Sequence, residues 1–165
     1  MIDLALSLAP LTPADLPASD RIDAHAFGPG RFARSAYRLR EGVAPDFTLS
    51  FAARVGTMLV GVNRMTPIHC GGAPALLLGP LTVEPAFRGR GIGGALVKAS
   101  LEAARAAGHR LVVLVGDEPY YKRFGFFRAP PGRLAMPGPV DSARLLACEL
   151  EAGAFEGVAG VIGRV

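Results

Sequence analysis

The sequence has no tryptophan, two cysteines and three histidines. Cys70 and Cys148 lie far apart and neither has a CxxC partner, so we expect two reduced, buried thiols and no disulfide. His25, His69 and His109 lack the spacing that metal ligands show. The scarcity of these residues argues against a disulfide-stapled protein and against a metal centre, and we expect no bound metal.

Long apolar runs are also missing. Gly, Pro, Arg or Asp interrupts each apolar stretch well before the roughly 20 residues that span a bilayer. The first residues, Met1-Ile2-Asp3-Leu4, carry an acid where a signal peptide has basic residues. The length of 165 residues, of which 50% are apolar, suits one domain over residues 1–165. We therefore expect a cytoplasmic protein that does not enter a membrane.

The formal charge of +4 comes from 18 basic and 14 acidic residues, and the basic residues are scattered. A nucleic-acid-binding surface usually has a denser basic stripe with interleaved aromatic residues, so no nucleic-acid partner is expected. A modest basic excess also suits a small ligand that carries phosphates. Charge alone does not decide between these partners.

Hydrophobic periodicity and turn residues predict the order of elements. Apolar alternation or continuous apolar runs predict strands over residues 2–8, 47–53, 58–68, 75–83, 111–115 and 145–150. Caps, breakers and helical periodicity predict helices over residues 12–26, 31–40, 92–107 and 119–124. An antiparallel meander followed by a β-α-β unit predicts an α/β fold in which helices cover both faces of a mixed sheet of six to seven strands.

The clearest local signal is the segment Arg88-Gly89-Arg90-Gly91-Ile92-Gly93-Gly94, which stands between a strand and a helix. Glycines allow a backbone to approach a ligand closely. The first amides of a helix lack internal partners, and the helix dipole favours an anion there. The segment therefore predicts a site for a pyrophosphate, with Arg88 neutralising part of its charge.

Two other phosphate motifs do not match this segment. A Walker loop places Lys-Ser or Lys-Thr after its last glycine, where this chain has Gly94-Ala95. A dinucleotide fingerprint needs the spacing G-x-G-x-x-G within a β-α-β unit, whereas here the preceding strands form a meander. A turn that binds no ligand would not require four glycines in the six residues 89–94.

The segment Val83-Glu84-Pro85-Ala86-Phe87-Arg88-Gly89-Arg90-Gly91-Ile92-Gly93 resembles the acyl-CoA-binding motif of the GNAT superfamily of N-acetyltransferases. Downstream, Tyr120-Tyr121-Lys122-Arg123-Phe124-Gly125-Phe126 is similar to the superfamily's aromatic-Tyr-x-x-x-Gly-Phe segment. Both motifs occur in the superfamily's order and separation. Gly116-Asp117-Glu118-Pro119 and the closing Cys148-Glu149-Leu150 also look like predicted bacterial acetyltransferases of the YhbS type.

The resemblance implies a GNAT-like fold in which the fourth and fifth strands, 75–83 and 111–115, splay apart. The gap would hold the pantetheine arm of acetyl-CoA against backbone groups of the fourth strand. The segment 88–94, called the glycine loop below, would hold the pyrophosphate. The residues expected to touch acetyl-CoA are Leu81, Thr82, Val83, Arg88, Gly89, Arg90, Gly91, Ile92, Gly93, Gly94 and Tyr120.

For a protein of this type the resemblance implies direct attack of a primary amine, of a small molecule or a protein, on acetyl-CoA. The Val83 backbone N–H would polarise the carbonyl oxygen. Tyr121 is the candidate general acid, because its pKa of about 10 keeps it protonated at neutral pH. A purely packing role for Tyr121 is the alternative. Tyr120 is expected to be the more tightly packed of the two tyrosines.

The general base is not evident. Glu84 follows the fourth strand and is expected to be a loop residue, and His69 lies near a turn. Asp117 and Glu118 would either bind a cationic substrate or cap the helix that follows them. The segment 31–40, with Arg34 near its centre, would either receive an acidic substrate or form a solvated basic face.

The sequence does not identify the amine acceptor, a preference for longer acyl groups or the oligomeric state. A homodimer is the commonest arrangement of soluble oligomers. A non-catalytic domain that senses acetyl-CoA is the alternative function. Retention of both the glycine loop and Tyr121 favours the enzyme.

Overall fold

The computed structural model describes residues 5–165. The beginning of the expected first strand, before Ala5, lies outside the described residues. The strands are β1 (Leu6–Pro10), β2 (Phe51–Val55), β3 (Met58–Cys70), β4 (Ala73–Val83), β5 (Leu111–Val115), β6 (Phe127–Arg128), β7 (Leu134–Ala135), β8 (Leu145–Glu149) and β9 (Gly160–Arg164). The helices are α1 (Leu16–Phe27), α2 (Ser35–Arg40), α3 (Ile92–Ala106) and α4 (Glu118–Tyr121), with short 3-10 turns at Pro13–Asp15, Pro29–Ala33, Pro85–Phe87, Lys122–Phe124 and Ser142–Arg144.

The expected mixed sheet is confirmed, but within the described residues it has nine strands, where six to seven were expected. Its main path runs β1-β2-β3-β4-β5-β8-β6, and β9 adds to β3 and pairs with β7. Along the main path every pair is antiparallel except β4 and β5. The Gly- and Pro-rich C-terminal part supplies more short strands than its sequence suggested, because β6, β7 and β9 are too short or too glycine-rich to show a period.

One strand boundary was wrong. The alternation over 47–53 predicted a strand, but residues 47–49 form a turn and β2 begins only at Phe51. Asp46 holds this turn, because its carboxylate accepts a hydrogen bond from the Thr48 amide at 2.9 Å and its carbonyl accepts one from the Ser50 amide at 3.0 Å. The local Asp turn overrides the apolar alternation.

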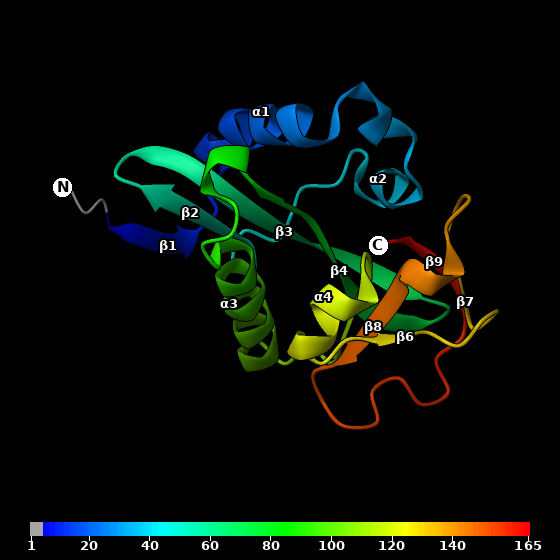
Figure 1. Cartoon of the computed structure of the whole chain (residues 1–165). Helices are drawn as coiled ribbons and strands as arrows, with labels where there is room; N and C mark the ends of the chain where they lie inside the picture. The colour runs from blue at the N-terminus through cyan, green and yellow to red at the C-terminus, as the bar shows by residue number, and fades with distance from the viewer. Residues whose placement is uncertain (1–4) are drawn as a thin grey trace.

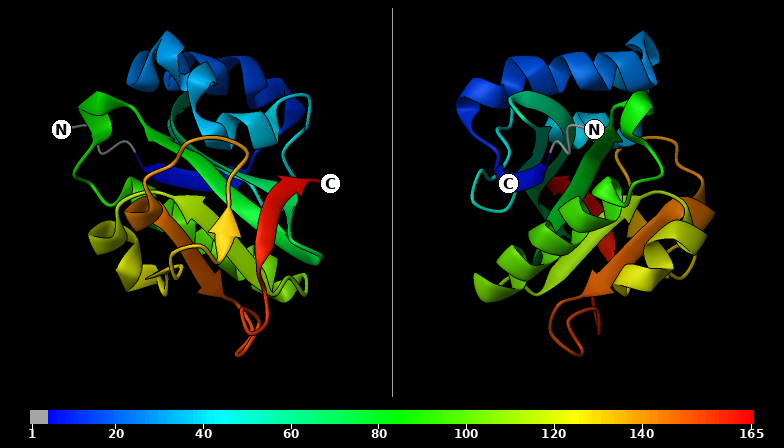
Figure 2. Two further views of the ribbon diagram at one scale, coloured as in Figure 1. Left: turned by 90° about the vertical axis from the view of Figure 1, so that its right-hand side faces the viewer. Right: turned by 60° about the vertical axis from the view of Figure 1, so that its left-hand side comes forward.

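Helices cover both faces of the sheet (Figures 1 and 2). The long helix α1 packs on one face of β3 and β4, and α3 packs on the opposite face of β2, β3 and β4. The signal expected to start a helix at Thr12 starts the 3-10 turn Pro13–Asp15, which leads into α1: Thr12 and Asp15 form a capping box, and Pro13 opens the turn. The predicted segment 31–40 divides into the Pro29–Ala33 turn and α2.

The central strands are buried on both faces, as their nearly continuous apolar sequences predicted. Leu77 and Val113 pack in a cluster that includes Leu39 of α2. Leu76 and Val112 point the other way and pack in a cluster formed with α3. The sheet therefore has two cores, one on each side of β4 and β5.

The strands β4 and β5 separate toward their C-terminal ends. They pair only at Leu76 with Val112 and at Leu77 with Val113. Beyond that point β4 carries a bulge: the register with β3 shifts between Asn63 and Met65, so that Gly79 and Pro80 together lie opposite one residue. A bulge bends its strand and increases the local twist. The expected splay between the fourth and fifth strands is present.

Candidate active site

The glycine loop leads into the positive end of α3. Gly91 is the N-cap and has a left-handed backbone with φ 79°, and Gly89 has φ 78°. The first bond of the helix joins the Ala95 amide to the Gly91 carbonyl at 3.1 Å. The amides between these two residues have no acceptor within the helix. They form a site for an anion at the start of a 15-residue helix.

Packing fixes the start of α3 against the sheet. A Cβ added to Gly61 of β3 would lie 3.1 Å from both Ile92 and Leu96, so a larger residue there would press on the start of the helix. At Gly89 and Gly91, in contrast, an added Cβ would meet nothing within 4 Å. Gly89 and Gly91 therefore allow the left-handed backbone of the loop and leave space beside it, and they are not required by packing in the core.

A cavity of about 500 Å³ lies beside this loop. Every residue that the sequence predicted to touch acetyl-CoA borders it except Arg90, which is exposed and lies over the Phe87 ring at 5.2 Å. Arg123 was not predicted and also borders the cavity, with its guanidinium 4.5 Å from the centre of the Tyr120 ring. The lining comprises Ala26, Phe27, Leu81, Thr82, Val83, Phe87, Arg88, Gly89, Gly91, Ile92, Gly93, Gly94, Tyr120 and Arg123.

Backbone groups of β4 face the gap. The Glu84 amide donates to the Val60 carbonyl of β3 at 2.8 Å. Because successive residues of an antiparallel strand alternate in the edge toward which their amides point, the N–H groups of Leu81 and Val83 face away from β3. The Val83 carbonyl accepts a bond of 3.4 Å from Arg88 Nε, so this edge is within reach of the glycine loop. The gap therefore exposes unpaired peptide groups to an extended ligand.

The two adjacent tyrosines differ in burial, and the expectation about their packing was wrong. Tyr121 is half-buried and packs against the cluster around Phe126, with ring centres 5.8 Å apart. Tyr120 is exposed, borders the cavity, and its hydroxyl lies 2.8 Å from the position of a Cβ at Gly93. Burial raises the pKa of Tyr121 to about 12, and Tyr120 and Asp117 act in the same direction. Tyr121 therefore keeps its proton at neutral pH.

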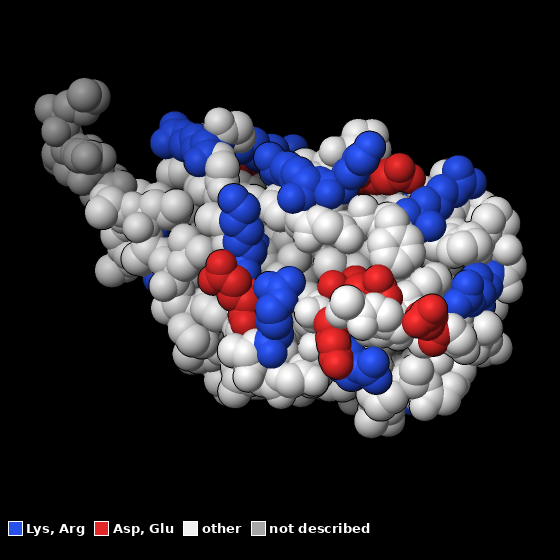
Figure 3. Space-filling view, turned by 90° about the horizontal axis from the view of Figure 1, so that it is seen from below, with Lys and Arg blue, Asp and Glu red and all other residues white. Residues whose placement is uncertain are grey.

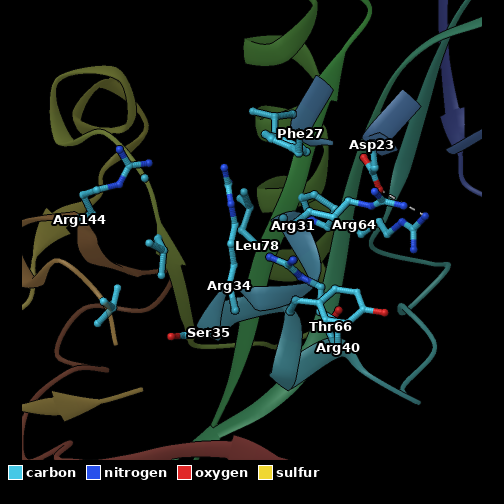
Figure 4. A pocket seen from close by; sticks show the side chains of 18 of the residues that line it. Asp23, Phe27, Arg31, Arg34, Ser35, Arg40, Arg64, Thr66, Leu78 and Arg144 are labelled. Carbon is cyan, nitrogen blue, oxygen red and sulfur yellow. Dashed lines mark ion pairs between the residues drawn. The ribbon is translucent and has the colours of Figure 1, made fainter. Parts of the chain in front are cut away.

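A second cavity, of about 770 Å³, opens on the other side of the splay (Figure 4). It is bounded by α1, α2, the bulge of β4 and the segment after β5, and both Tyr120 and Tyr121 line it. The side chains of Arg31, Arg34, Arg40, Arg64 and Arg144 border it, with Asp20, Asp23, Glu41, Asp117 and Asp141. It shares Phe27, Leu81 and Tyr120 with the first cavity, so the two meet at the splay.

Ion pairs neutralise part of this lining. Arg64 contacts Asp20 at 2.6 Å and Asp23 at 3.6 Å. On the opposite wall Arg144 contacts Asp117 at 2.9 Å. The expected capping role of Asp117 is absent, because its side chain makes no cap bond to the helix that it precedes.

Other predicted candidates lie elsewhere. Glu118 does not line either cavity, whereas Arg34 lines the second one. Glu84 follows β4 as expected and lies 3.5 Å from His25 Nδ1. His69 contacts the Gly71 carbonyl at 3.1 Å near the far end of β3, away from both cavities.

Sequence reasoning missed one buried acid, Asp23, and did not separate Arg40 from the other arginines of the segment 31–40. Asp23 of α1 accepts a hydrogen bond of 2.6 Å from the Thr82 hydroxyl. Burial raises the pKa of the Asp23 carboxyl above its usual value, and the Thr82 bond and the Arg64 charge oppose this rise. Arg40 lies at the end of α2 beside Gly79 of the bulge. An acid within an apolar stretch of a helix, Ile22-Asp23-Ala24, was the one available signal for Asp23.

The comparisons with known proteins agree with this geometry. Residues 48–127, which include β4, the glycine loop, α3 and both tyrosines, match the model of the acetyltransferase (GNAT) domain. The chain is 28% identical over 152 residues to an uncharacterized N-acetyltransferase, YhbS, of Escherichia coli, covering 91% of this chain and 90% of YhbS. The chain belongs to the GNAT family of N-acetyltransferases.

Solved structures of GNAT proteins superpose on the whole chain. YhbS of Escherichia coli in complex with CoA has a TM-score of 0.84 at 25% identity, covering 100% of this chain and 92% of that protein. A GNAT family acetyltransferase from Brucella melitensis in complex with acetyl-CoA has a TM-score of 0.62 at 28% identity, covering 93% and 99%. The mixed sheet with parallel β4 and β5 is thus the GNAT fold.

The surface of this GNAT protein shows no dominant charge on the face seen in Figure 3, where positive and negative side chains are interspersed. Within residues 5–165, no helix is long and apolar enough to cross a membrane. The same residues contain no group of three or more His, Cys, Asp or Glu side chains placed to hold a metal ion.

Proposed function

We propose that the protein transfers the acetyl group of acetyl-CoA to a primary amine, which attacks directly without an acetyl-enzyme. The observation that carries this proposal is the splay after Leu77 and Val113, which lies between the glycine loop on one side and the second cavity on the other. The family relationship supports the acetyl donor, since two related GNAT proteins were solved with CoA and with acetyl-CoA.

The residues at the first cavity fit coenzyme A. Free amides at the start of α3, open space around Gly89 and Gly91, and the guanidinium groups of Arg88 and Arg123 form a cradle for a pyrophosphate. The unpaired peptide edge of Leu81 and Val83 suits the amide groups of a pantetheine arm, which bonds as an added strand would.

Bound acetyl-CoA supplies the acetyl group as a reactive thioester. The Val83 N–H, which faces the gap, is the donor that we assign to the thioester carbonyl oxygen, where negative charge develops during attack. This donor belongs to a strand that is fixed by its pairing with β3, so it needs no rearrangement when the charge appears. Backbone geometry therefore supplies the electrostatic part of catalysis.

Tyr121 is the residue that we assign as general acid. Its hydroxyl carries a proton throughout the neutral range, because burial holds its pKa at about 12. The protonated phenol is available to the departing thiolate at the splay. Asp23 is the residue that we assign as candidate base, because it is a buried carboxylate of the cavity lining and burial raises its pKa above the usual value.

The second cavity is the place that we assign to the amine. Because it shares Phe27, Leu81 and Tyr120 with the first cavity, an amine there reaches the thioester without an intermediate carrier. Ordered proximity of two bound reactants supplies a large part of the rate enhancement. A cytoplasmic location and a homodimer remain predictions.

The proposal is tested with purified protein, acetyl-CoA and a panel of amines, peptides and polyamines. We expect thiol release that depends on one class of amine, with the acetylated amine identified by mass spectrometry. Tight acetyl-CoA binding without turnover of any amine would instead support a sensor of acetyl-CoA.

A further inference from the structure

We propose that the acceptor amine also carries an oxyanion, a carboxylate or a phosphate, which binds to Arg40 and Arg34 in the second cavity. This inference rests on the proposed function and narrows its substrate class. It is carried by the unsatisfied guanidinium of Arg40, by the charges around it, and by its position beside the splay.

Arg40 is held at the bulge of β4. Its Nη2 lies 3.2 Å from the position that a Cβ would take at Gly79, so the glycine makes room for the guanidinium. The Nε atom is enclosed by protein, and no residue between 5 and 165 accepts a hydrogen bond from it. An enclosed donor without a partner is costly, and native proteins rarely keep one that nothing uses.

A purely structural arginine in this fold is satisfied differently. Arg133 donates from Nε to the Val158 carbonyl and from Nη2 to the Phe155 carbonyl at 3.0 Å, so backbone acceptors hold its guanidinium in place. Among the described residues, Arg40 has neither such carbonyls nor a carboxylate within ion-pair distance. Because the enclosed Nε is out of a ligand's reach, the comparison favours an external acceptor for the terminal Nη groups of Arg40, which borders the cavity.

The local charge around Arg40 is positive. The charged groups that act on it are Asp23, Arg64 and Arg34, and Asp23 is already within 3.6 Å of Arg64. Three guanidinium groups thus face one buried carboxylate, Asp23, and the exposed carboxylate of Asp20, which pairs with Arg64 at 2.6 Å. Burial lowers the pKa of Arg40 to about 10, so the group remains charged at neutral pH. An anion bound there would restore the balance.

Arg34 adds a second free cation. Its guanidinium lies over the Phe27 ring at 5.0 Å and makes no ion pair with any residue of the described chain. Of the four other acids of the lining, Asp20 pairs with Arg64 and Asp117 pairs with Arg144. Asp141 accepts a bond of 2.9 Å from the Ala143 amide, and Glu41 follows α2 without an ion pair to Arg40 or Arg34. Figure 4 shows Arg34, Arg40 and Arg64 on one side of the cavity and Arg144 on the other.

The position of Arg40 connects this charge to the reaction. Gly79 belongs to the part of β4 that has left β5, and Tyr121 lines the same cavity. An acceptor whose anion binds Arg40 is therefore held at the splay with its amine free. Two planar guanidinium groups suit a carboxylate or a phosphate, because each presents paired N–H donors.

The test uses matched pairs of amines: amino acids with their amides, and phosphorylated amines with their unphosphorylated parents. The kcat/KM of each is measured for the wild type, Arg40→Gln, Arg40→Lys and the control Arg21→Gln. Arg21 is an exposed residue of α1 that does not line either cavity. The pairs also distinguish a carboxylate from a phosphate as the favoured anion.

We expect the anionic member of at least one pair to be preferred in the wild type. Arg40→Gln should lower its kcat/KM by about tenfold to a hundredfold, the loss expected for one charged hydrogen-bonding partner. The neutral amine should lose much less, so that the preference for the anionic member falls; Arg40→Lys should restore part of that preference, and Arg21→Gln should leave it as in the wild type. Equal activity on both members of every pair, or an equal loss on both in Arg40→Gln, would overturn the proposal.

A binding measurement separates this inference from the proposed function. Calorimetric titration of the same pairs into the CoA complex reports anion recognition without turnover. Anion-dependent binding that Arg40→Gln abolishes supports the oxyanion site even if no amine is acetylated. That combination would reject the proposed acetyl transfer and keep the oxyanion site. Absent binding of every anionic amine, or binding that ignores the substitution, rejects the site.

Discussion

The ring of Tyr121 lies directly over Gly116, such that a Cβ at Gly116 would come within 2.5 Å of Tyr121 Cε2. Because Gly116, just after β5, has no side chain, the phenol of Tyr121 can occupy this position. Gly116 has an ordinary backbone conformation, so its substitution acts through this contact and not through backbone strain.

Gly116→Ala should therefore displace the Tyr121 ring and lower kcat, with little effect on the affinity for CoA. Overpacking of this kind also costs about 1–3 kcal/mol of stability. Steady-state kinetics with a CoA titration checks the split. Gly72→Ala is the control, because an added Cβ there meets nothing within 4 Å. An unchanged kcat in Gly116→Ala would show that the ring position is irrelevant to turnover.

Tyr121→Phe should lower kcat by about a hundredfold or more, the usual contribution of a general acid, while the Kd for acetyl-CoA stays constant. Tyr120→Phe is the matched comparison, because it removes a neighbouring phenol that borders the glycine loop. We expect it to retain most of the wild-type kcat. Equal kcat values for wild type and Tyr121→Phe would remove Tyr121 from the mechanism.

The pKa of Tyr121 also predicts an alkaline effect on stability. The phenol titrates near 12 in the folded chain and near 10 when exposed. Between these values the unfolded chain loses this proton and the folded chain keeps it, so the free energy of unfolding falls as pH rises from 10 to 12. Denaturant unfolding across that window should show a shallower decline in Tyr121→Phe. Identical slopes would argue against a buried, protonated phenol.

Gly91→Glu should weaken CoA binding far more than Gly91→Ala. Both variants force a side chain into the left-handed backbone at φ 79°, which costs about 1–2 kcal/mol. Only glutamate adds a negative charge at the start of α3, where the pyrophosphate is proposed to bind. Isothermal titration with CoA distinguishes charge from strain. Equal Kd values for the two variants would place the pyrophosphate elsewhere.

The regular parts of this fold were legible in the sequence. β4, β5 and α3 have periodic or continuous apolar patterns, and glycines mark the start of α3. The sequence therefore predicted these three elements and the glycine loop to within a few residues. The order of burial in Tyr120 and Tyr121 was not legible, because adjacent residues on one helical turn point in different directions and only packing decides which is buried.

Asp23 was missed, and Arg40 was not distinguished within the segment 31–40, for a related reason. Each is a single charged residue on a helix, and each meets β4 only in the folded chain, Asp23 at Thr82 and Arg40 at Gly79. No local pattern states that Gly79 leaves room for a guanidinium or that Thr82 supplies a hydrogen bond to Asp23. Long-range contacts of this kind follow from tertiary structure alone.

The central claim, direct acetyl transfer at the splay, is tested most directly by initial velocities measured while acetyl-CoA and the amine are varied together. The account predicts CoA release that requires the amine, with double-reciprocal lines that intersect because both reactants are bound at once. Parallel lines, or release of CoA at the same rate without any amine, would contradict it.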